Sequence, residues 1–176
     1  MTVKTWVCNI CEDPYIGEDR PTHCPFCGAP SKYIVDGKEF KEPAVGELTD
    51  SEKNNIIAAI KLEVGNANFY FCGARTAQTL EHRKRFKALG KVEAEHATLL
   101  AKMIKSEKPT IDRNTEGCPT DDAALVKEAF DREDNAIKKY SQFLEEATDK
   151  RVKQVFASLV EIETTHLELE KEEIEG

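Results

Sequence analysis

Six side chains that can bind metal ions recur in this sequence at one fixed offset. A glutamate followed by a Glu-x-x-His motif occurs twice, and each member of the second set follows its counterpart by 70 residues. The six residues are Glu63, Glu93, His96, Glu133, Glu163 and His166. On four helices, this combination of four carboxylates and two imidazoles binds a pair of iron or manganese ions. The repeat therefore predicts a two-metal site for oxygen or redox chemistry, although a zinc pair is also compatible with these ligands.

The spacing within each motif supports this prediction. Residues three positions apart project from one face of a helix, so Glu93 and His96 can bind one site together, as can Glu163 and His166. The four glutamates also balance the charge of two ferrous ions. A glutamate taken alone is usually a solvated helix residue, because charged side chains are seldom buried without a partner. Here, however, six such residues lie on the apolar faces of the predicted helices and repeat at the same 70-residue spacing. Together they favour the metal site.

Two tyrosines follow the same repeat. Tyr70 and Tyr140 each lie seven residues, about two helical turns, after Glu63 and Glu133. Because helical side chains lean toward the N-terminus of their helix, each hydroxyl is placed to hydrogen-bond a ligand carboxylate. The alternative is a core tyrosine whose hydroxyl finds another partner. We expect loss of either hydroxyl to change the properties of the bound metals more than it lowers the stability of the fold.

A second metal site is predicted from the cysteines near the N-terminus. Cys8-x-x-Cys11 and Cys24-x-x-Cys27 place four thiolates on two short loops, a pattern that is typical of one tetrahedral metal. Paired CxxC motifs also indicate a reducing compartment and argue against disulfides. The four ligands fit either zinc, which would be structural, or iron, which would carry one electron at a time.

Two further cysteines and two further histidines lie outside both patterns. We interpret Cys72 and Cys118 as small buried side chains rather than redox groups. His23 and His82 are expected to be ordinary surface residues.

Composition limits the classes of function that remain. The chain has 176 residues, of which 40% are hydrophobic and 33% charged, with a formal net charge of -8. An acidic chain whose charges are interleaved offers no basic patch for nucleic acid. The N-terminus has no apolar signal region, and no segment has the roughly 20 apolar residues of a membrane span. We therefore expect a cytoplasmic protein without a membrane or nucleic-acid partner.

The sequence divides into two domains joined by a short linker. Residues 1–40 are rich in proline and glycine and too short for a large core, so we expect a small domain that folds around its metal. Residues 41–48 are read as a linker, and residues 49–176 show helical periodicity. A capping box at Thr49 and Glu52 starts the first helix. Further helices are expected from about Thr79 to Lys105, from near Thr120, and after Asp149.

The lengths of the connections predict the topology of these four helices. The first and second helices are joined tightly, as are the third and fourth, whereas about a dozen residues separate the second from the third. An extended segment of that length spans roughly 40 Å, enough to cross a whole bundle. We predict a mainly α, ferritin-like four-helix bundle built from two antiparallel hairpins and one long crossover.

These motifs together resemble the rubrerythrin family. The sequences VCNIC and CPFCGAP are similar to a rubredoxin-like metal domain, and the doubled Glu/Glu-x-x-His set is similar to a ferritin-like di-iron bundle. The domain order resembles that of reverse rubrerythrins. The resemblance implies iron in both sites, with zinc possible in the cysteine site as prepared. It also implies peroxidase activity in oxidative stress: hydrogen peroxide is reduced to water at the di-iron pair.

The same resemblance implies a route for electrons. An external donor protein of the rubredoxin or reductase type, supplied by NAD(P)H, would pass electrons through the cysteine-bound iron. This chain departs from the family at two positions: Ala136 stands where a further carboxylate is common, and Glu12 stands where the first cysteine loop usually has glycine.

Helix length suggests how the two sites communicate. The ligands lie near the middle of helices, about 20 Å from either end, so a cysteine domain that caps its own bundle would be distant from them. We therefore predict a homodimer in which electrons cross between subunits.

Two other functions remain open from the sequence. One is a ferritin-like protein that binds and oxidises ferrous iron without sustained peroxide turnover. The other is a non-enzymatic module with zinc in the cysteine site and a structural metal in the bundle.

Overall fold

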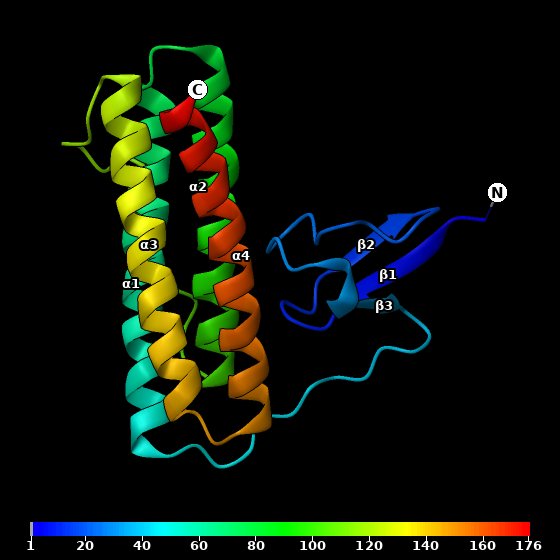
Figure 1. Cartoon of the computed structure of the whole chain (residues 1–176). Coiled ribbons are helices and arrows are strands. Elements are labelled where there is room, and N and C mark those ends of the chain that lie inside the picture. The colour runs from blue at the N-terminus through cyan, green and yellow to red at the C-terminus, as the bar shows by residue number, and fades with distance from the viewer. Residues whose placement is uncertain (1) are drawn as a thin grey trace.

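The computed structural model describes residues 2–176 and contains four long helices preceded by a small sheet (Figure 1). The helices are α1 (Asp50–Thr76), α2 (Leu80–Met103), α3 (Asp122–Glu146) and α4 (Lys150–Glu175). Each begins at a side-chain cap, provided by Thr49, Thr79, Asp121 and Asp149. The predicted capping box of α1 is present, with Thr49 and Glu52 each satisfying a backbone N–H of the other.

Two predicted helix limits are wrong by about two residues. The second helix ends at Met103 rather than Lys105, because the backbone turns there and Lys105 adopts a φ of 53°. The third helix begins at Asp122 rather than near Thr120, since the Asp121 side chain accepts a hydrogen bond from the N–H of Ala124 and so fixes the start.

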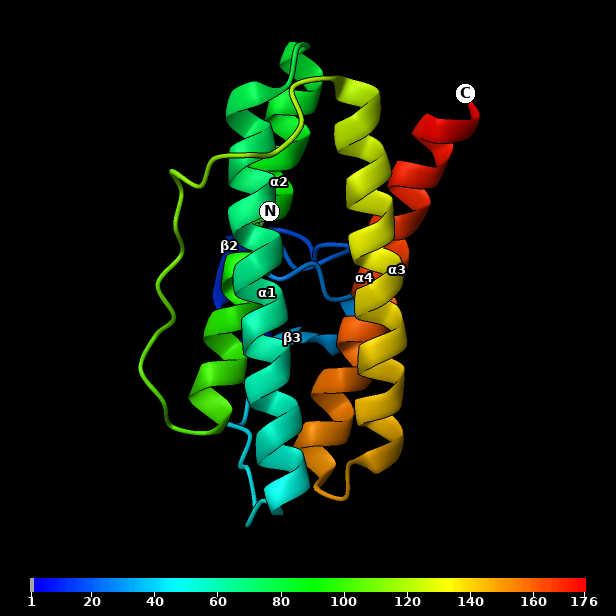
Figure 2. The ribbon, with the colours of Figure 1, turned by 90° about the vertical axis from the view of Figure 1, so that its left-hand side faces the viewer.

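The four helices form a bundle of two antiparallel hairpins, as predicted. One hairpin is α1 with α2 and the other is α3 with α4, and α1 packs beside α3. Residues 104–121 connect the hairpins and run along the outside of the bundle from one end to the other (Figure 2). Arg75 of α1 holds this crossover by donating hydrogen bonds to the carbonyl groups of Arg113 and Thr115.

The 70-residue repeat of the sequence is visible as a pseudo-two-fold relation between the hairpins. The ring of Tyr70 stacks on Phe86 with centroids 5.9 Å apart, and Tyr140 stacks on Phe156 at the same 5.9 Å. The interplanar angles, 23° and 25°, also agree. All four rings are buried. The repeat therefore fixes packing as well as the positions of the metal-binding residues.

The same relation holds at the two ends of the bundle. Glu52 in the first turn of α1 accepts hydrogen bonds from the N–H groups of Thr148 and Asp149, in the turn between α3 and α4. Seventy residues later, Asp122 accepts from the N–H groups of Gln78 and Thr79, in the turn between α1 and α2. Each hairpin thus uses one carboxylate to close the turn of the other.

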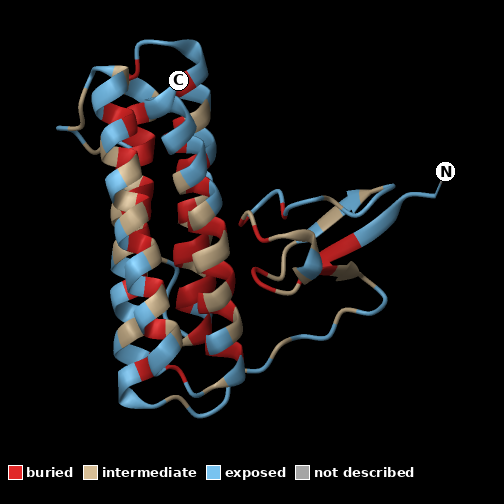
Figure 3. Cartoon of the chain, viewed as in Figure 1, coloured by how far each residue is buried: buried red, intermediate tan, exposed pale blue. Residues whose placement is uncertain are grey.

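The small N-terminal sheet packs against one side of the bundle. Its strands are β1 (Lys4–Cys8), β2 (Pro14–Gly17) and β3 (Ile34–Asp36), which pair antiparallel in the order β2-β1-β3. Buried residues of its loops face the bundle and belong to the same apolar core as residues of the helices (Figure 3). Residues 37–49, between β3 and α1, form neither helix nor strand.

Candidate metal centres

The four cysteines of the N-terminal domain converge on one point. Their sulfur atoms all lie within 4.8 Å of one another, and the domain buries all four residues. The Cys8 and Cys27 sulfurs are 3.8 Å apart, and those of Cys11 and Cys24 are 3.7 Å apart. A tetrahedron of metal–sulfur bonds of about 2.3 Å has edges of about 3.8 Å. The thiols therefore already stand at the separations of a tetrahedral zinc or iron site.

The backbone at this site adopts the same turn after each CxxC pair. The N–H of Glu12 donates to the carbonyl of Cys8, and the N–H of Gly28 donates to that of Cys24, both at 2.9 Å. Both turns need a positive φ, 72° at Glu12 and 78° at Gly28. This conformation suits glycine and strains a residue with a Cβ. Glu12, which departs from the family pattern, therefore occupies a strained position.

A contact to the bundle compensates for the strain at Glu12. Its carboxylate forms an ion pair with Arg151 of α4, at 3.1 Å. The Arg151 guanidinium also donates to the carbonyl groups of Asn9 and Ile10 in the same loop. Arg151 is buried, so these bonds are shielded from water. The first cysteine loop is thereby fastened to the start of α4.

The six repeated residues meet in the middle of the bundle. Their ligand atoms form two groups, and the atoms of each group lie within 4.8 Å of one another. One group contains Glu63, Glu93, His96 and Glu163, and the other contains Glu93, Glu133, Glu163 and His166. Five of the six are fully buried, and His166 is 8% exposed. The structure thus brings together all the residues that the sequence singled out.

Glu93 and Glu163 belong to both groups because each directs its two oxygens to different histidines. Oε2 of Glu93 lies 3.2 Å from Nδ1 of His96, and Oε1 lies 3.3 Å from Nδ1 of His166. For Glu163 the two distances are 3.3 Å to His96 and 3.0 Å to His166. Glu93 and Glu163 would therefore contribute oxygens to both groups if metal were bound, whereas Glu63 and Glu133 would each contribute to one group.

The tyrosines pair with these lone glutamates across the bundle. The Tyr70 hydroxyl on α1 donates to Oε1 of Glu133 on α3, and the Tyr140 hydroxyl on α3 donates to Oε1 of Glu63 on α1. Each tyrosine therefore holds the glutamate of the opposite hairpin rather than that of its own helix. The other oxygen of each glutamate has no hydrogen-bond partner among residues 2–176.

These unpartnered oxygens test whether the site fits a metal pair. Oε1 of Glu93 and of Glu163 are likewise buried without a hydrogen bond within the described chain. A buried carboxylate oxygen with no partner costs free energy, and a cation at the centre of the cluster would remove that cost. Four such oxygens around two imidazoles fit a pair of iron or manganese ions, and they also accept zinc.

The pKa values show how the cluster is balanced when protons take the place of metal. Burial raises the pKa of Glu63 and Glu133 well above the usual range, and neighbouring carboxylates raise it further. Burial opposes charge on His96 and His166 too, but the surrounding carboxylates outweigh it and raise both pKa values. Burial likewise opposes charge on Glu93, yet the His166 and His96 rings beside its two oxygens lower its pKa. Without metal, the surroundings therefore favour the protonated forms of Glu63, Glu133, His96 and His166.

A hydrogen bond connects the two candidate metal sites within one chain. The Nε2–H of His96 donates to the carbonyl oxygen of Cys27 at 2.8 Å. This bond turns the other ring nitrogen, Nδ1, toward the carboxylates, where it can bind a metal ion in place of a proton. The imidazole ring spans the boundary between the cysteine domain and the bundle.

This contact overturns the reason for expecting electrons to cross between subunits. The cysteine domain lies against the side of its own bundle, near the level of the ligands, and does not cap an end (Figure 1). Lys32 and Tyr33 both bind Glu161 of α4, at 2.8 and 3.0 Å. A Cβ added to Gly28 would lie 3.2 Å from Ile162. The homodimer itself stays a prediction.

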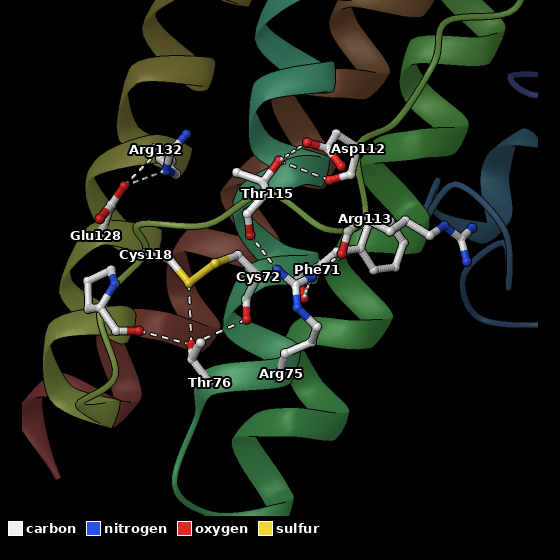
Figure 4. The surroundings of a disulfide bond; sticks show 11 residues. Phe71, Cys72, Arg75, Thr76, Asp112, Arg113, Thr115, Cys118, Glu128 and Arg132 are labelled. Carbon is white, nitrogen blue, oxygen red and sulfur yellow. Dashed lines mark hydrogen bonds and ion pairs between the residues drawn. A yellow bond between two sulfur atoms is a disulfide. The ribbon is translucent and has the colours of Figure 1, made fainter.

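The interpretation of Cys72 and Cys118 as separate buried side chains is wrong. The two form a disulfide, with a Cα–Cα distance of 6.1 Å, that ties the crossover to α1 (Figure 4). The Thr76 hydroxyl lies within hydrogen-bond distance of the Cys118 sulfur and of the carbonyl groups of Cys72 and Pro119. Sequence spacing gave no signal, because the two cysteines meet only after the crossover has folded back.

His82 is also misplaced as a surface residue. It is 7% exposed and lies between Asp122 and Glu173, at 3.0 and 3.2 Å. His23, in contrast, is exposed as expected. The sequence did contain a signal for this burial, because His82 lies four residues before Phe86 and so on the same helix face. In the structure the two rings stack 6.1 Å apart.

Comparisons with known proteins agree with this architecture. The family model described as Rubrerythrin matches residues 54–174, which cover most of the bundle. Searches of curated proteins and of solved structures gave no match. Across residues 2–176, none of the helices combines the length and apolar character that crossing a membrane would require.

Proposed function

Because this chain belongs to the rubrerythrin family, we propose that it is a peroxidase that reduces hydrogen peroxide to water at a di-iron site in the bundle. Family membership implies a di-iron bundle with a peroxide-related or iron-binding function. The finer assignment rests on one observation, the hydrogen bond from His96 to Cys27. A protein that only stores iron has no use for a four-thiolate site one imidazole ring away from its metal pair.

The bundle residues prepare the site for this reaction. Glu93 and Glu163 would hold the two metal ions together with His96 and His166, and the crossed tyrosines fix the orientation of Glu63 and Glu133. Burial of the cluster keeps bulk water away, which strengthens every charge interaction inside it. When iron is bound, the pair supplies the two electrons that break the O–O bond.

The cysteine domain provides the entry for electrons. Iron bound by four thiolates changes its charge by one unit, with little movement of a rigid shell. Cys27 is one of the four thiolate ligands, and its backbone carbonyl accepts a hydrogen bond from His96 of the bundle. Covalent bonds and one hydrogen bond therefore connect the two candidate sites within one chain. We assign delivery to an external donor protein of the rubredoxin or reductase type, supplied by NAD(P)H.

The test compares steady peroxide reduction in four proteins. The reaction contains NAD(P)H, a rubredoxin-type carrier with its reductase, and iron-loaded protein. Wild type and Glu145→Ala, an exposed glutamate of α3, should turn over continuously. Cys8→Ser and Glu133→Ala should each lose about a hundredfold or more in rate, because each removes a direct ligand.

Two outcomes would favour other functions. Ferrous oxidation by the wild type without sustained peroxide turnover would support an iron-binding protein of the ferritin type. A colourless protein with zinc in the cysteine site after anaerobic iron loading would support the structural module, since iron bound by four thiolates absorbs visible light.

A further inference from the structure

The metal cluster lies between two layers of buried side chains that the repeat makes nearly identical. Each layer contains one residue per helix, seven positions from that helix's ligand glutamate. One layer consists of Ile56, Leu100, Tyr140 and Phe156, and the other of Val126, Glu170, Tyr70 and Phe86. All eight side chains are buried to 2% exposure or less. The layers differ in polarity at one place, where Leu100 on α2 corresponds to Glu170 on α4.

Glu170 is a carboxyl group in a place where its counterpart is apolar. It is 0% exposed, and neither of its oxygens has a hydrogen-bond partner among residues 2–176. It forms a long ion pair with Arg85 of α2, with Nη1 at 3.8 Å from Oε2. Burial without a hydrogen bond is unfavourable, and leucine at the mirror position avoids that cost. Packing alone therefore gives no reason for a glutamate here.

A route to solvent begins beside Glu170. Arg85 extends from it to Glu173 at the surface, where the two side chains are 2.9 Å apart. Glu173 lines a surface pocket together with His82, Asp122, Lys127 and the layer residue Val126. The pocket therefore reaches from solvent to the layer that contains Glu170.

The inner end of this route meets one half of the metal cluster. Tyr70, in the same layer, donates its hydrogen bond to Glu133, which belongs to the group with His166. His166 precedes Glu170 by one helical turn. Glu170 is not one of the clustered ligand atoms within residues 2–176, so its place is beside the cluster rather than in it.

We infer that Glu170 carries protons from the surface pocket to the oxygen species that is reduced at the metal pair. The inference rests on the proposed function, because peroxide reduction consumes protons. Hydrogen peroxide takes up two electrons and two protons and yields two water molecules, as the O–O bond breaks and two O–H bonds form. Glu170 would give one proton inward, remain briefly as a carboxylate beside Arg85, and regain a proton from solvent in the pocket.

The surrounding charges suit a group that cycles between both forms. Burial raises the pKa of Glu170 to about 7, while Arg85, His166 and His82 oppose that rise. Glu173, on the pocket side, raises it further. The other titratable groups of this region are Tyr70 on α1, in the same layer, and Asp122 and Lys127 on α3, which line the pocket. An acid with a pKa near the working pH is efficient at proton transfer.

The first test measures the reaction of reduced, iron-loaded protein with peroxide. Glu170→Gln keeps the shape of the side chain but cannot exchange a proton, and Glu172→Gln is the matched control at an exposed position of α4. We expect Glu170→Gln to react about a hundredfold more slowly and to lose the pH dependence near 7, with unchanged iron content and unchanged reduction of the cysteine site. Glu170→Leu, which copies the mirror layer, should fold and be equally slow.

Equal rates and pH profiles for Glu170→Gln and wild type would overturn the inference, as would loss of iron from the variant, which would make Glu170 a ligand. If the wild type does not turn over peroxide, the proposed function fails, and the same variants are then compared with dioxygen as the oxidant. If wild type and Glu170→Gln then react with dioxygen at equal rates, the proton role of Glu170 is overturned independently of the proposed function.

The second test does not depend on turnover. A protonated carboxyl group has an infrared C=O band that shifts in D₂O when its proton exchanges. The difference spectrum between wild type and Glu170→Gln should contain such a band at pH 6, and the band should shift soon after transfer to D₂O. A missing band, or one that resists exchange, would contradict a route through the pocket.

Discussion

Glu52 shows how one buried carboxylate can hold several chain segments together. It accepts hydrogen bonds from Thr49, Thr148 and Asp149, which belong to two different helix ends. Burial alone raises the pKa of Glu52, but the backbone N–H donors outweigh it and lower the pKa to about 2. The ionised form is therefore favoured in the folded protein.

This pKa predicts how stability depends on pH. Because the pKa is depressed on folding, the contribution of Glu52 is present above about pH 4.5 and is lost as the pH falls toward 2. We expect Glu52→Gln to cost about 1–3 kcal/mol at pH 7 and much less at pH 3. Urea unfolding at the two pH values measures this, with Glu47→Gln, an exposed linker residue, as control. A cost that is equal at both pH values would contradict the assignment.

At the scale of elements, the crossover is the least repeated part of the bundle and depends on its own attachments. The disulfide between Cys72 and Cys118 and the hydrogen bonds from Arg75 hold it to α1. The disulfide joins residues 46 positions apart, so it restricts a long loop of the unfolded chain.

Removal of this disulfide should loosen the crossover more than the site. We expect the double variant Cys72→Ala/Cys118→Ala to lose about 3 kcal/mol of stability. Amide exchange should rise in residues 104–121, while iron content stays unchanged because Glu63 and Glu133 are held separately. Wild-type protein reduced with a dithiol should behave like the variant. An unchanged unfolding midpoint would show that the disulfide contributes little.

At the scale of the whole molecule, the cysteine domain and the bundle act as one unit. Arg151 binds the first cysteine loop, Glu161 binds the segment around Tyr33, and His96 binds the second loop. The first two contacts lie on α4 and the third lies on α2, so the cysteine domain is held to both hairpins. The proposed electron transfer from the cysteine site to the bundle would therefore have a route within a single chain.

An intrachain path predicts the result of a mixing experiment. Subunits with Cys8→Ser lack a cysteine ligand, and subunits with Glu133→Ala lack a bundle ligand. If electrons stay within one chain, mixed oligomers of the two should show no more turnover than the parents. Sedimentation first establishes whether the expected homodimer forms and exchanges. Recovery of activity in proven heterodimers would show that electrons cross between subunits.

Metal binding should exchange protons for metal ions across the whole bundle. In the metal-free protein His96, His166, Glu63 and Glu133 have raised pKa values. Groups with raised pKa values stabilise the folded state at low pH and lose that effect as pH rises. Metal-free protein should therefore become less stable from pH 5 to pH 8.

Iron binding should show the opposite trend, because protons compete for the same atoms. Its affinity should increase with pH, and binding should release protons that calorimetry in buffers of different ionisation enthalpy can count. Chelation should lower the thermal midpoint most at high pH. Uptake of iron without proton release would contradict this balance.

The sequence by itself predicted the class of fold and which residues gather in the two candidate sites. The cysteine spacing, the 70-residue repeat and the helical periodicity are local patterns, and each follows from the geometry of a single loop or helix. The capping box at Thr49 and the two-hairpin topology were predictable for the same reason. Local geometry does not depend on how distant segments meet.

Only the tertiary structure decided the relations between segments. The disulfide of Cys72, the crossed bonds of the tyrosines and the contact from His96 to Cys27 each join residues far apart in the chain. The burial of Glu170 likewise depends on what the other three helices place around it. The repeat is symmetric in sequence, but the surroundings of Glu170 make the folded site asymmetric.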